Sequence, residues 1–314
     1  MWFWLSITTL LFWSGSDLLS KIGCRDKDDK YSHLKMVIAV GVVMGLHACY
    51  EIFVGGATVN LQIMWIYLPV SLLYIVSMAM GYIGLRYIEL SISSPICNSS
   101  GALVALLTLL TFGSEDYSPL AIGAVVLVCL GAIGLGFVDH FEDDTLRAER
   151  QKASNYKYAK SFMAIAMPVA YCMLDAAGTF ADNFAVVKIN EYLNLATDSD
   201  VGVAAANVSY ELTFLVAAVL CFIYVVGIKR QKLLPKREVP KYAGAICETI
   251  GQFTYIFAIT DTEHLAMSAP IISSYCAASV LWSRLFLKEK LSWKHYTAIA
   301  LIVIGIVIMG VFDM

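Results

Sequence analysis

The sequence predicts an all-α polytopic membrane protein, with ten transmembrane helices arranged as two inverted five-helix repeats. Its 314 residues are 59% hydrophobic and only 15% charged, whereas soluble domains have about 45–50% apolar and about 25% charged residues. The apolar residues form blocks about 20 residues long, the length that crosses a hydrocarbon core of about 30 Å. A transmembrane β-barrel would instead show alternating segments of about ten residues. The third observation is a repeat of proline, glycine and acidic positions between the two halves of the chain.

Polar breaks between the apolar blocks place the ten spans. The first half contains spans at 2–22, 33–54, 63–84, 91–112 and 118–138. The second half contains spans at 159–183, 207–228, 241–260, 264–286 and 295–313. The longest charged connector divides the chain into a first repeat (1–138), a cytoplasmic linker (139–158) and a second, inverted repeat (159–314). The first block follows no basic segment and has no small-residue cleavage site, so we expect a retained span and not a signal peptide.

Basic residues are concentrated in alternate connectors. All but one of the 22 Lys and Arg residues lie in connectors that follow odd-numbered spans, and the exception is Lys188. Because cytoplasmic loops of membrane proteins are enriched in Lys and Arg, the odd connectors should be cytoplasmic. Both termini are then expected on the extracytoplasmic side of the cell membrane.

An internal repeat links the fourth and ninth spans. The segment "LSISSPICNSSGALVALLTLL" aligns with "LAMSAPIISSYCAASVLWSRL", so that Pro95 falls on Pro270. With a slip of one residue, Gly131 of the fifth span falls on Gly305 of the tenth. Each half has an odd number of spans, so the two copies must cross the membrane in opposite senses. Inverted repeats around a site near the bilayer midplane are typical of secondary transporters.

Several spans contain polar residues that we expect to face a shared interior, because a carboxylate in contact with lipid costs free energy. Trp13 and Asp17 are four residues apart in the first span, and Tyr171 and Asp175 are four apart in the sixth. That spacing puts each pair on one helical face. The other predicted substrate-binding residues are Asn98, Glu248, Gln252, Tyr255, Tyr275 and Trp282. The candidates for proton coupling are Asp17, Asp175 and Glu248, and Pro95 and Pro270 are expected to start or kink their helices.

Some of these residues have a second interpretation. Asp17 and Lys21 are also four residues apart, so the two charges could neutralise each other near the membrane edge. The acids Asp182, Glu51 and Glu211 lie near span ends, where interfacial positions are the simpler explanation. His47 fits a packed residue of the second span, and most aromatic residues of such chains serve packing or the interface.

The candidate residues suit a cationic substrate or a proton. Aromatic faces attract cations, carboxylates supply the counter-charge, and a buried acid can take up a proton. An anionic substrate would need Lys or Arg in the middle of the spans, whereas Lys21 and Arg284 lie near span ends. The sequence has no P-loop, no HExxH motif and no CxxC pair among its eight cysteines. We therefore expect no ATP-driven pumping, no metal, no cofactor and no nucleic-acid partner.

Two segments resemble a known family. The stretch "APIISSYCAASVLWSRLFLKEKLSWKHYTAIALIVIGIVIMG" is similar to the closing helix pair of EamA-type proteins of the drug/metabolite transporter superfamily, and "FWSGSDLLSKIG" resembles their first helix. The resemblance implies a ten-helix carrier whose central cavity is lined by spans 1, 3, 4, 6, 8 and 9, without naming a substrate. The chain departs from the family in two respects. The charges place its termini outside, and connector 184–206 is longer than the family's tight links.

Together these patterns predict a secondary active transporter, not an enzyme, that moves a small cationic or zwitterionic metabolite by alternating access. Protons are a candidate coupling ion, and spans 3/4 and 8/9 are the expected gates. One alternative is an exporter of amino acids or neutral metabolites, in which the acids serve only protons. An alternative of another class is a non-transporting membrane protein or a lipid flippase. A flippase should have a groove that opens laterally to lipid.

Overall fold

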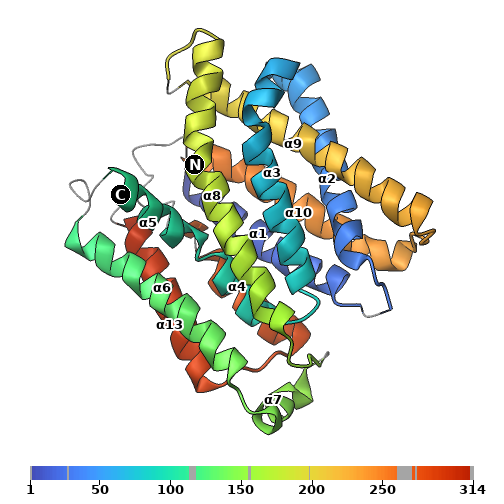
Figure 1. The fold of residues 1–314 in the computed structure, drawn as a ribbon, viewed down its shortest axis with the longest axis vertical. Helices are drawn as coiled ribbons and strands as arrows, with labels where there is room; N and C mark the ends of the chain where they lie inside the picture. Colours follow the sequence, from blue (N-terminus) through green and yellow to red (C-terminus); the bar gives the residue numbers. More distant parts are fainter. Residues whose placement is uncertain are drawn as a thin grey trace.

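The computed structural model describes residues 2–26, 28–112, 118–154, 157–197, 199–259, 271–272 and 274–311, and every regular element among them is a helix (Figure 1). The all-α prediction is therefore confirmed. Among the described residues, five helices are long and apolar enough to cross a membrane: Ser32–Gly55, Leu61–Gly84, Ile122–His140, Phe162–Tyr192 and Asp200–Ile228. Two shorter apolar helices are Tyr275–Leu287 and Trp293–Ile308.

The first half of the chain contributes six helices and the linker a seventh. They are α1 (Trp2–Cys24), α2 (Ser32–Tyr50), α3 (Leu61–Gly84), α4 (Leu90–Cys97), α5 (Ser100–Phe112), α6 (Pro119–His140) and α7 (Asp144–Arg150). A π-helical turn, η1 (Glu51–Gly55), extends α2, and a 3-10 turn, η2 (Gln151–Ala153), follows α7. Asp143 caps the start of α7, because its side chain accepts hydrogen bonds from the Thr145 hydroxyl and backbone N–H. Both hydrogen bonds lower the pKa of Asp143, and the bond from the Thr145 hydroxyl has the larger effect.

The predicted fourth span, 91–112, is two helices and not one. Helix α4 ends at Cys97 and α5 starts at Ser100. Pro95 has no N–H to continue the helical hydrogen bonds, and Ser99 Oγ donates to the Pro95 carbonyl at 2.9 Å. Pro95 therefore lies inside α4 and does not begin a helix, and the break follows it within one turn.

The second half contains α8 (Phe162–Tyr192), α9 (Asp200–Phe222), α10 (Pro235–Ile259), α12 (Tyr275–Trp282) and α13 (Trp293–Val311). The π-helical turns η3 (Ile223–Ile228) and η4 (Ser283–Leu287) extend α9 and α12. The first residues of the predicted span 264–286, including Pro270, lie outside the described residues.

The predicted long connector 184–206 is wrong. Helix α8 continues to Tyr192 and α9 begins at Asp200, so the link is short. Asn190 holds it closed, since its Nδ2 donates to the carbonyls of Thr197 at 3.0 Å and Ser199 at 3.1 Å. At 31 residues, α8 is about 46 Å long and extends beyond a hydrocarbon core of about 30 Å. Its polar last turns therefore interrupt the hydrophobic pattern without ending the helix.

The helices pair across the two halves. Helix α1 packs along α10 and α3 along α8, while α2 packs on α9 and α6 on α13. In Figure 1, α6 and α13 run side by side on one flank, and α2 and α9 lie on the other. Because α1 corresponds to α8 and α3 to α10 in the predicted repeats, exchanging the two halves would reproduce this set of pairings.

Glycines bring α6 and α13 into close contact. A Cβ added at Gly131 would lie 2.8 Å from the Ala298 carbonyl oxygen, and one at Gly305 would lie 2.8 Å from that of Ala124. Small residues at such crossings let membrane helices approach closely. The two contacts are counterparts of each other, because Gly131 aligns with Gly305 in the predicted repeat.

Candidate substrate cavity

A cavity of about 1420 Å³ lies between the helices. Its walls come from α1, α3, α4, α5, α8, α10 and α12, and also from α2, α9 and α13, which the sequence did not predict. At one end the lining residues Ser20, Leu85 and Leu90 are buried. At the other end Asp200 and Val203 are exposed. The cavity is therefore closed near the linker helix α7, which we call the linker end, and open at the opposite end.

Nine of the ten predicted binding residues line this cavity: Trp13, Asp17, Asn98, Tyr171, Asp175, Glu248, Gln252, Tyr255 and Tyr275. The tenth, Trp282, is not among the lining residues, because its indole points to α1, where Nε1 donates to Ser14 Oγ at 2.9 Å. The first and sixth helices of the prediction thus direct their acids, Asp17 and Asp175, into one shared space.

Asp17 is held by hydroxyl groups from both halves of the chain. Ser94 Oγ of α4 donates to its Oδ2 at 2.5 Å, and Ser279 Oγ of α12 donates to the same oxygen at 2.6 Å. Lys21 does not pair with Asp17, since its Nζ donates to the Leu85 carbonyl at 2.6 Å and to the Ile88 carbonyl. The described residues therefore show no ion pair between Asp17 and Lys21, and that alternative is not realised.

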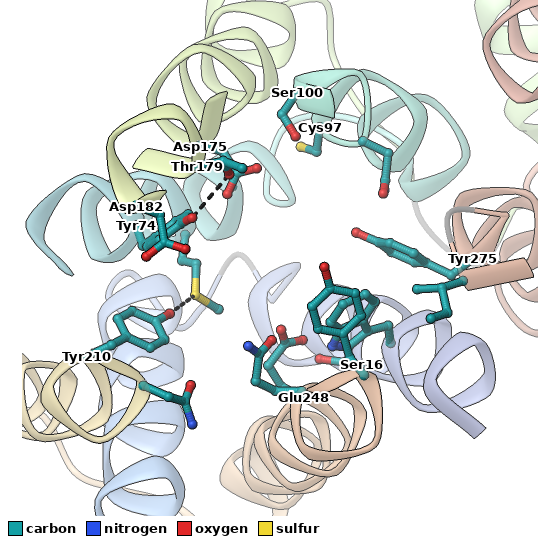
Figure 2. A pocket seen from close by; sticks show the side chains of 18 of the residues that line it. Ser16, Tyr74, Cys97, Ser100, Asp175, Thr179, Asp182, Tyr210, Glu248 and Tyr275 are labelled. Carbon is teal, nitrogen blue, oxygen red and sulfur yellow. Dashed lines mark hydrogen bonds between the residues drawn. The ribbon is translucent and has the colours of Figure 1, made fainter. Parts of the chain in front are cut away.

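Asp175 and Glu248 point into the opening from opposite sides, as Figure 2 shows. The Ser100 hydroxyl group lies on the side of Asp175, and the Ser16 hydroxyl group lies on the side of Glu248. Within the part of the chain that the structure describes, neither carboxylate forms an ion pair with Lys or Arg. A buried carboxylate without a cation is energetically costly, and either a cation or a proton at these two acids would remove that cost.

An aromatic corner flanks the acids. The Trp13 ring lies 5.1 Å from that of Tyr255 and 5.4 Å from that of Tyr275, measured between centroids. The ring also lies directly on Gly251 of α10, where an added Cβ would come within 2.4 Å of Trp13 Cδ1. Its counterpart Tyr171 lies in the same way on α3, where a Cβ at Gly81 would come within 2.8 Å of the tyrosine ring. A glycine in each half therefore makes room for the aromatic residue of the other half.

Gly251→Ala is expected to weaken ligand binding about tenfold, which corresponds to about 1.4 kcal/mol. The new methyl group must push the Trp13 ring toward the cavity, because the indole cannot flex away as a long side chain can. Binding to the purified protein by calorimetry would measure the effect. Gly101→Ala is the matched control, since Gly101 also lines the cavity but a Cβ there meets nothing within 4 Å. Equal affinities for the two variants would contradict the expectation.

Sequence reasoning missed several lining residues near the open end, among them His47, Glu51, Tyr67 and Asp182. His47 Nδ1 lies 2.9 Å from Glu211 Oε1, and the Tyr67 hydroxyl donates to Asp182 at 2.5 Å. A residue near a span end is easily taken for an interfacial one. The available signal was spacing, because Asp182 is seven residues after Asp175 and therefore lies on the same face of α8.

The cavity wall is acidic overall. Among the described residues, its lining contains six carboxylates and no Lys or Arg: Asp17, Glu51, Asp175, Asp182, Asp200 and Glu248. A wall of one charge attracts the opposite charge, most strongly where low-dielectric surroundings focus the field. The cavity can thus concentrate cations and should repel anions.

A second cluster of acids and histidine does not form a metal site. Asp139, Glu142 and His295 lie close enough together to hold an ion. However, Arg147 Nη2 lies 3.1 Å from Asp139, and Arg150 Nη2 lies 2.9 Å from Glu142. Because guanidinium groups already neutralise the carboxylates, this cluster is an ion-pair network.

Comparisons with known proteins agree with this architecture. Residues 210–311 match the EamA-like transporter family. A solved structure described only as "Crystal structure of protein" has a TM-score of 0.55 and 14% sequence identity, covering 97% of this chain and 94% of that chain, so it is similar in fold. No curated protein matches the sequence. Over residues 210–311 the chain is therefore similar to the EamA-like transporter family.

Proposed function

We propose that this protein is a secondary active transporter that carries a small organic cation or zwitterion through the cavity by alternating access. The observation that carries the proposal is the absence of Lys and Arg from a described lining with six carboxylates. Buried carboxylates favour either a bound cation or a proton over an uncompensated charge. A substrate with an ammonium group satisfies them, and the aromatic corner around Trp13 adds cation–π attraction.

The proposed architecture is ten spans in two inverted repeats, 1–138 and 159–314, joined by the linker 139–158. The exchanged helix pairings and the reciprocal contacts of Gly131 and Gly305 support it. The bias of Lys and Arg supports a cytoplasmic linker end and extracytoplasmic termini. In that orientation the cavity opens away from the cytoplasm.

Proton coupling is proposed for Asp17, Asp175 and Glu248. A carboxylate that releases its proton when the substrate binds, and takes one up when the substrate leaves, makes the two fluxes interdependent. Asp175 and Glu248 face each other across the opening (Figure 2), so one substrate can reach both. If the acids serve only protons, the substrate would instead be neutral, as in an exporter of amino acids.

A ligand screen of the purified protein tests the proposal. A primary amine, a diamine or a quaternary ammonium compound should raise the melting temperature, because a ligand at 100 times its Kd stabilises the folded state by about 2.7 kcal/mol. Sugar phosphates and other anions should have no effect. Uptake of the positive compounds into proteoliposomes, with and without a pH gradient, would then measure transport and its coupling. Stabilisation by anions alone would contradict a cation-binding cavity, and stabilisation by neutral amino acids alone would favour the exporter.

A further inference from the structure

Charged side chains hold the closed linker end of the cavity in place. We call its lining residues Ser20, Leu85 and Leu90 the floor of the cavity. Lys21 follows the floor residue Ser20 and donates from Nζ to the carbonyl of a second floor residue, Leu85, at 2.6 Å. The third floor residue, Leu90, donates its backbone N–H to Glu289 at 3.2 Å. The closed end is therefore fastened from outside the cavity by one cation and one anion.

Glu289 joins the second half of the chain to the first. It lies before α13, yet its carboxylate accepts hydrogen bonds from Ser91 N at 3.1 Å and Ser91 Oγ at 2.8 Å, at the start of α4. The first N–H groups of a helix need such partners, and a negative charge there is favourable. Burial raises the pKa of Glu289, an effect that the charge of Lys21 opposes. The helix that begins at the floor is thus capped by a residue of the other half.

The linker adds a third attachment. Arg150 at the end of α7 donates to Glu89 at 2.7 Å and to the Lys290 carbonyl at 3.3 Å. Gln151 also donates to Glu89, at 2.5 Å. Tyr158, further along the linker, places its ring centroid 4.3 Å from Lys21 Nζ. The linker therefore connects the start of α4 to the segment before α13.

Four of these charged side chains are almost fully removed from water. Lys21 is 0%, Glu89 1% and Glu289 2% exposed, and the Arg150 side chain is 8% exposed. Buried charges are stable only while their partners remain in place. When the groups separate and become hydrated, that cost disappears, so the cluster suits a contact that forms and breaks. An apolar seal of the same area would instead expose hydrophobic surface on opening.

We propose that Lys21, Glu89, Arg150 and Glu289 form a latch that closes the linker end of the cavity, and that a substrate passes this end only after the latch breaks. The proposal rests on the proposed alternating-access transport. It adds the first helix and the linker to the gates expected from the sequence, which were spans 3/4 and 8/9.

A native cysteine reports on the latch. Cys97 lines the cavity and lies seven residues beyond Leu90, about 10 Å along the chain. Right-side-out and inside-out membrane vesicles would be treated with a cationic, membrane-impermeant thiol reagent, and the Cys97 peptide quantified by mass spectrometry. The exposed side chain of Lys152 allows Lys152→Cys to mark the linker side. Wild-type Cys97 should react only from the side opposite the linker.

Glu289→Ala and Arg150→Ala should each make Cys97 reactive from the linker side. The labelling rate from that side should be at least about tenfold above wild type, because loss of the latch shifts the population toward the state that is open at the linker end. Glu149→Ala is the matched control, because Glu149 is also on α7 but is 68% exposed and pairs only with Lys152 among the described residues. Arg150 lies at the end of the short linker helix α7, so its variant keeps the test available if Glu289→Ala does not fold.

The latch and the proposed function can fail separately. If both latch variants bind amines like wild type but their Cys97 still reacts from one side only, the latch is refuted and cation transport stands. If Cys97 becomes reactive from the linker side but no amine or other cation is bound or transported, the latch stands and the substrate assignment falls. Labelling of exposed Cys49, which is outside the cavity lining, should be the same in every variant.

Discussion

Asp17→Asn is expected to reduce the transport of a cationic substrate at least about tenfold, a loss of about 1.4 kcal/mol or more, while the protein still folds. The substitution removes the negative charge from a side chain that accepts hydrogen bonds from Ser94 and Ser279. Asparagine has nearly the same volume, so packing is preserved while the negative charge and the proposed proton site are lost. Asp175→Asn should have a comparable effect, since Asp175 lines the same cavity. Initial uptake rates in proteoliposomes would measure both variants.

Ser14→Ala is a suitable control for this prediction. Ser14 is on the same helix, less than one turn from Asp17, but it bonds to Trp282 and does not line the cavity. Its transport should stay close to wild type. Wild-type flux in both aspartate variants, in particular under a pH gradient, would remove these two acids from the mechanism.

Gly131→Ala and Gly305→Ala should each destabilise the folded protein by about 1–3 kcal/mol, the usual cost of overpacking a close contact. In both cases the added Cβ would lie 2.8 Å from a backbone carbonyl oxygen of the facing helix. Backbone cannot move aside as a flexible side chain can, so α6 and α13 must separate. Thermal unfolding in detergent or lipid would measure the loss.

Gly134→Ala provides the comparison within the same helix, because a Cβ at Gly134 meets nothing within 4 Å. That variant should be neutral or slightly stabilising, since alanine is the better helix former by about 1 kcal/mol. The double variant Gly131→Ala/Gly305→Ala should lose less than the sum of the single losses, because one substitution already separates the helices. Strict additivity would indicate that the two contacts do not share one interface.

Local patterns were sufficient for much of this architecture. Each predicted span contains a helix in the described residues, since hydrophobic length is a local property. The four-residue spacing of Trp13 and Asp17, and of Tyr171 and Asp175, was enough to anticipate that both acids face one interior. Neither inference depends on knowing which distant segments meet.

The predictions that failed depend instead on contacts between segments that are distant in the sequence. The partners of Lys21 are carbonyl groups more than 60 residues away in the chain, so its four-residue distance from Asp17 was misleading. The polar end of α8 is helical because Asn190 bonds across the turn, which hydropathy cannot register. His47 and Asp182 line the cavity because α2 and α8 extend beside its mouth, and only the packing of whole helices decides that.

The linker introduces an imbalance into a molecule whose helices are otherwise duplicated. Arg150 and Tyr158 brace one end of the bundle, and the described residues contain no second copy of this segment at the other end. Under the proposed alternating access, the two end conformations should then differ in free energy. The substrate-free protein should favour the conformation that is open on the side remote from α7. Such a built-in preference would set from which compartment each cycle starts.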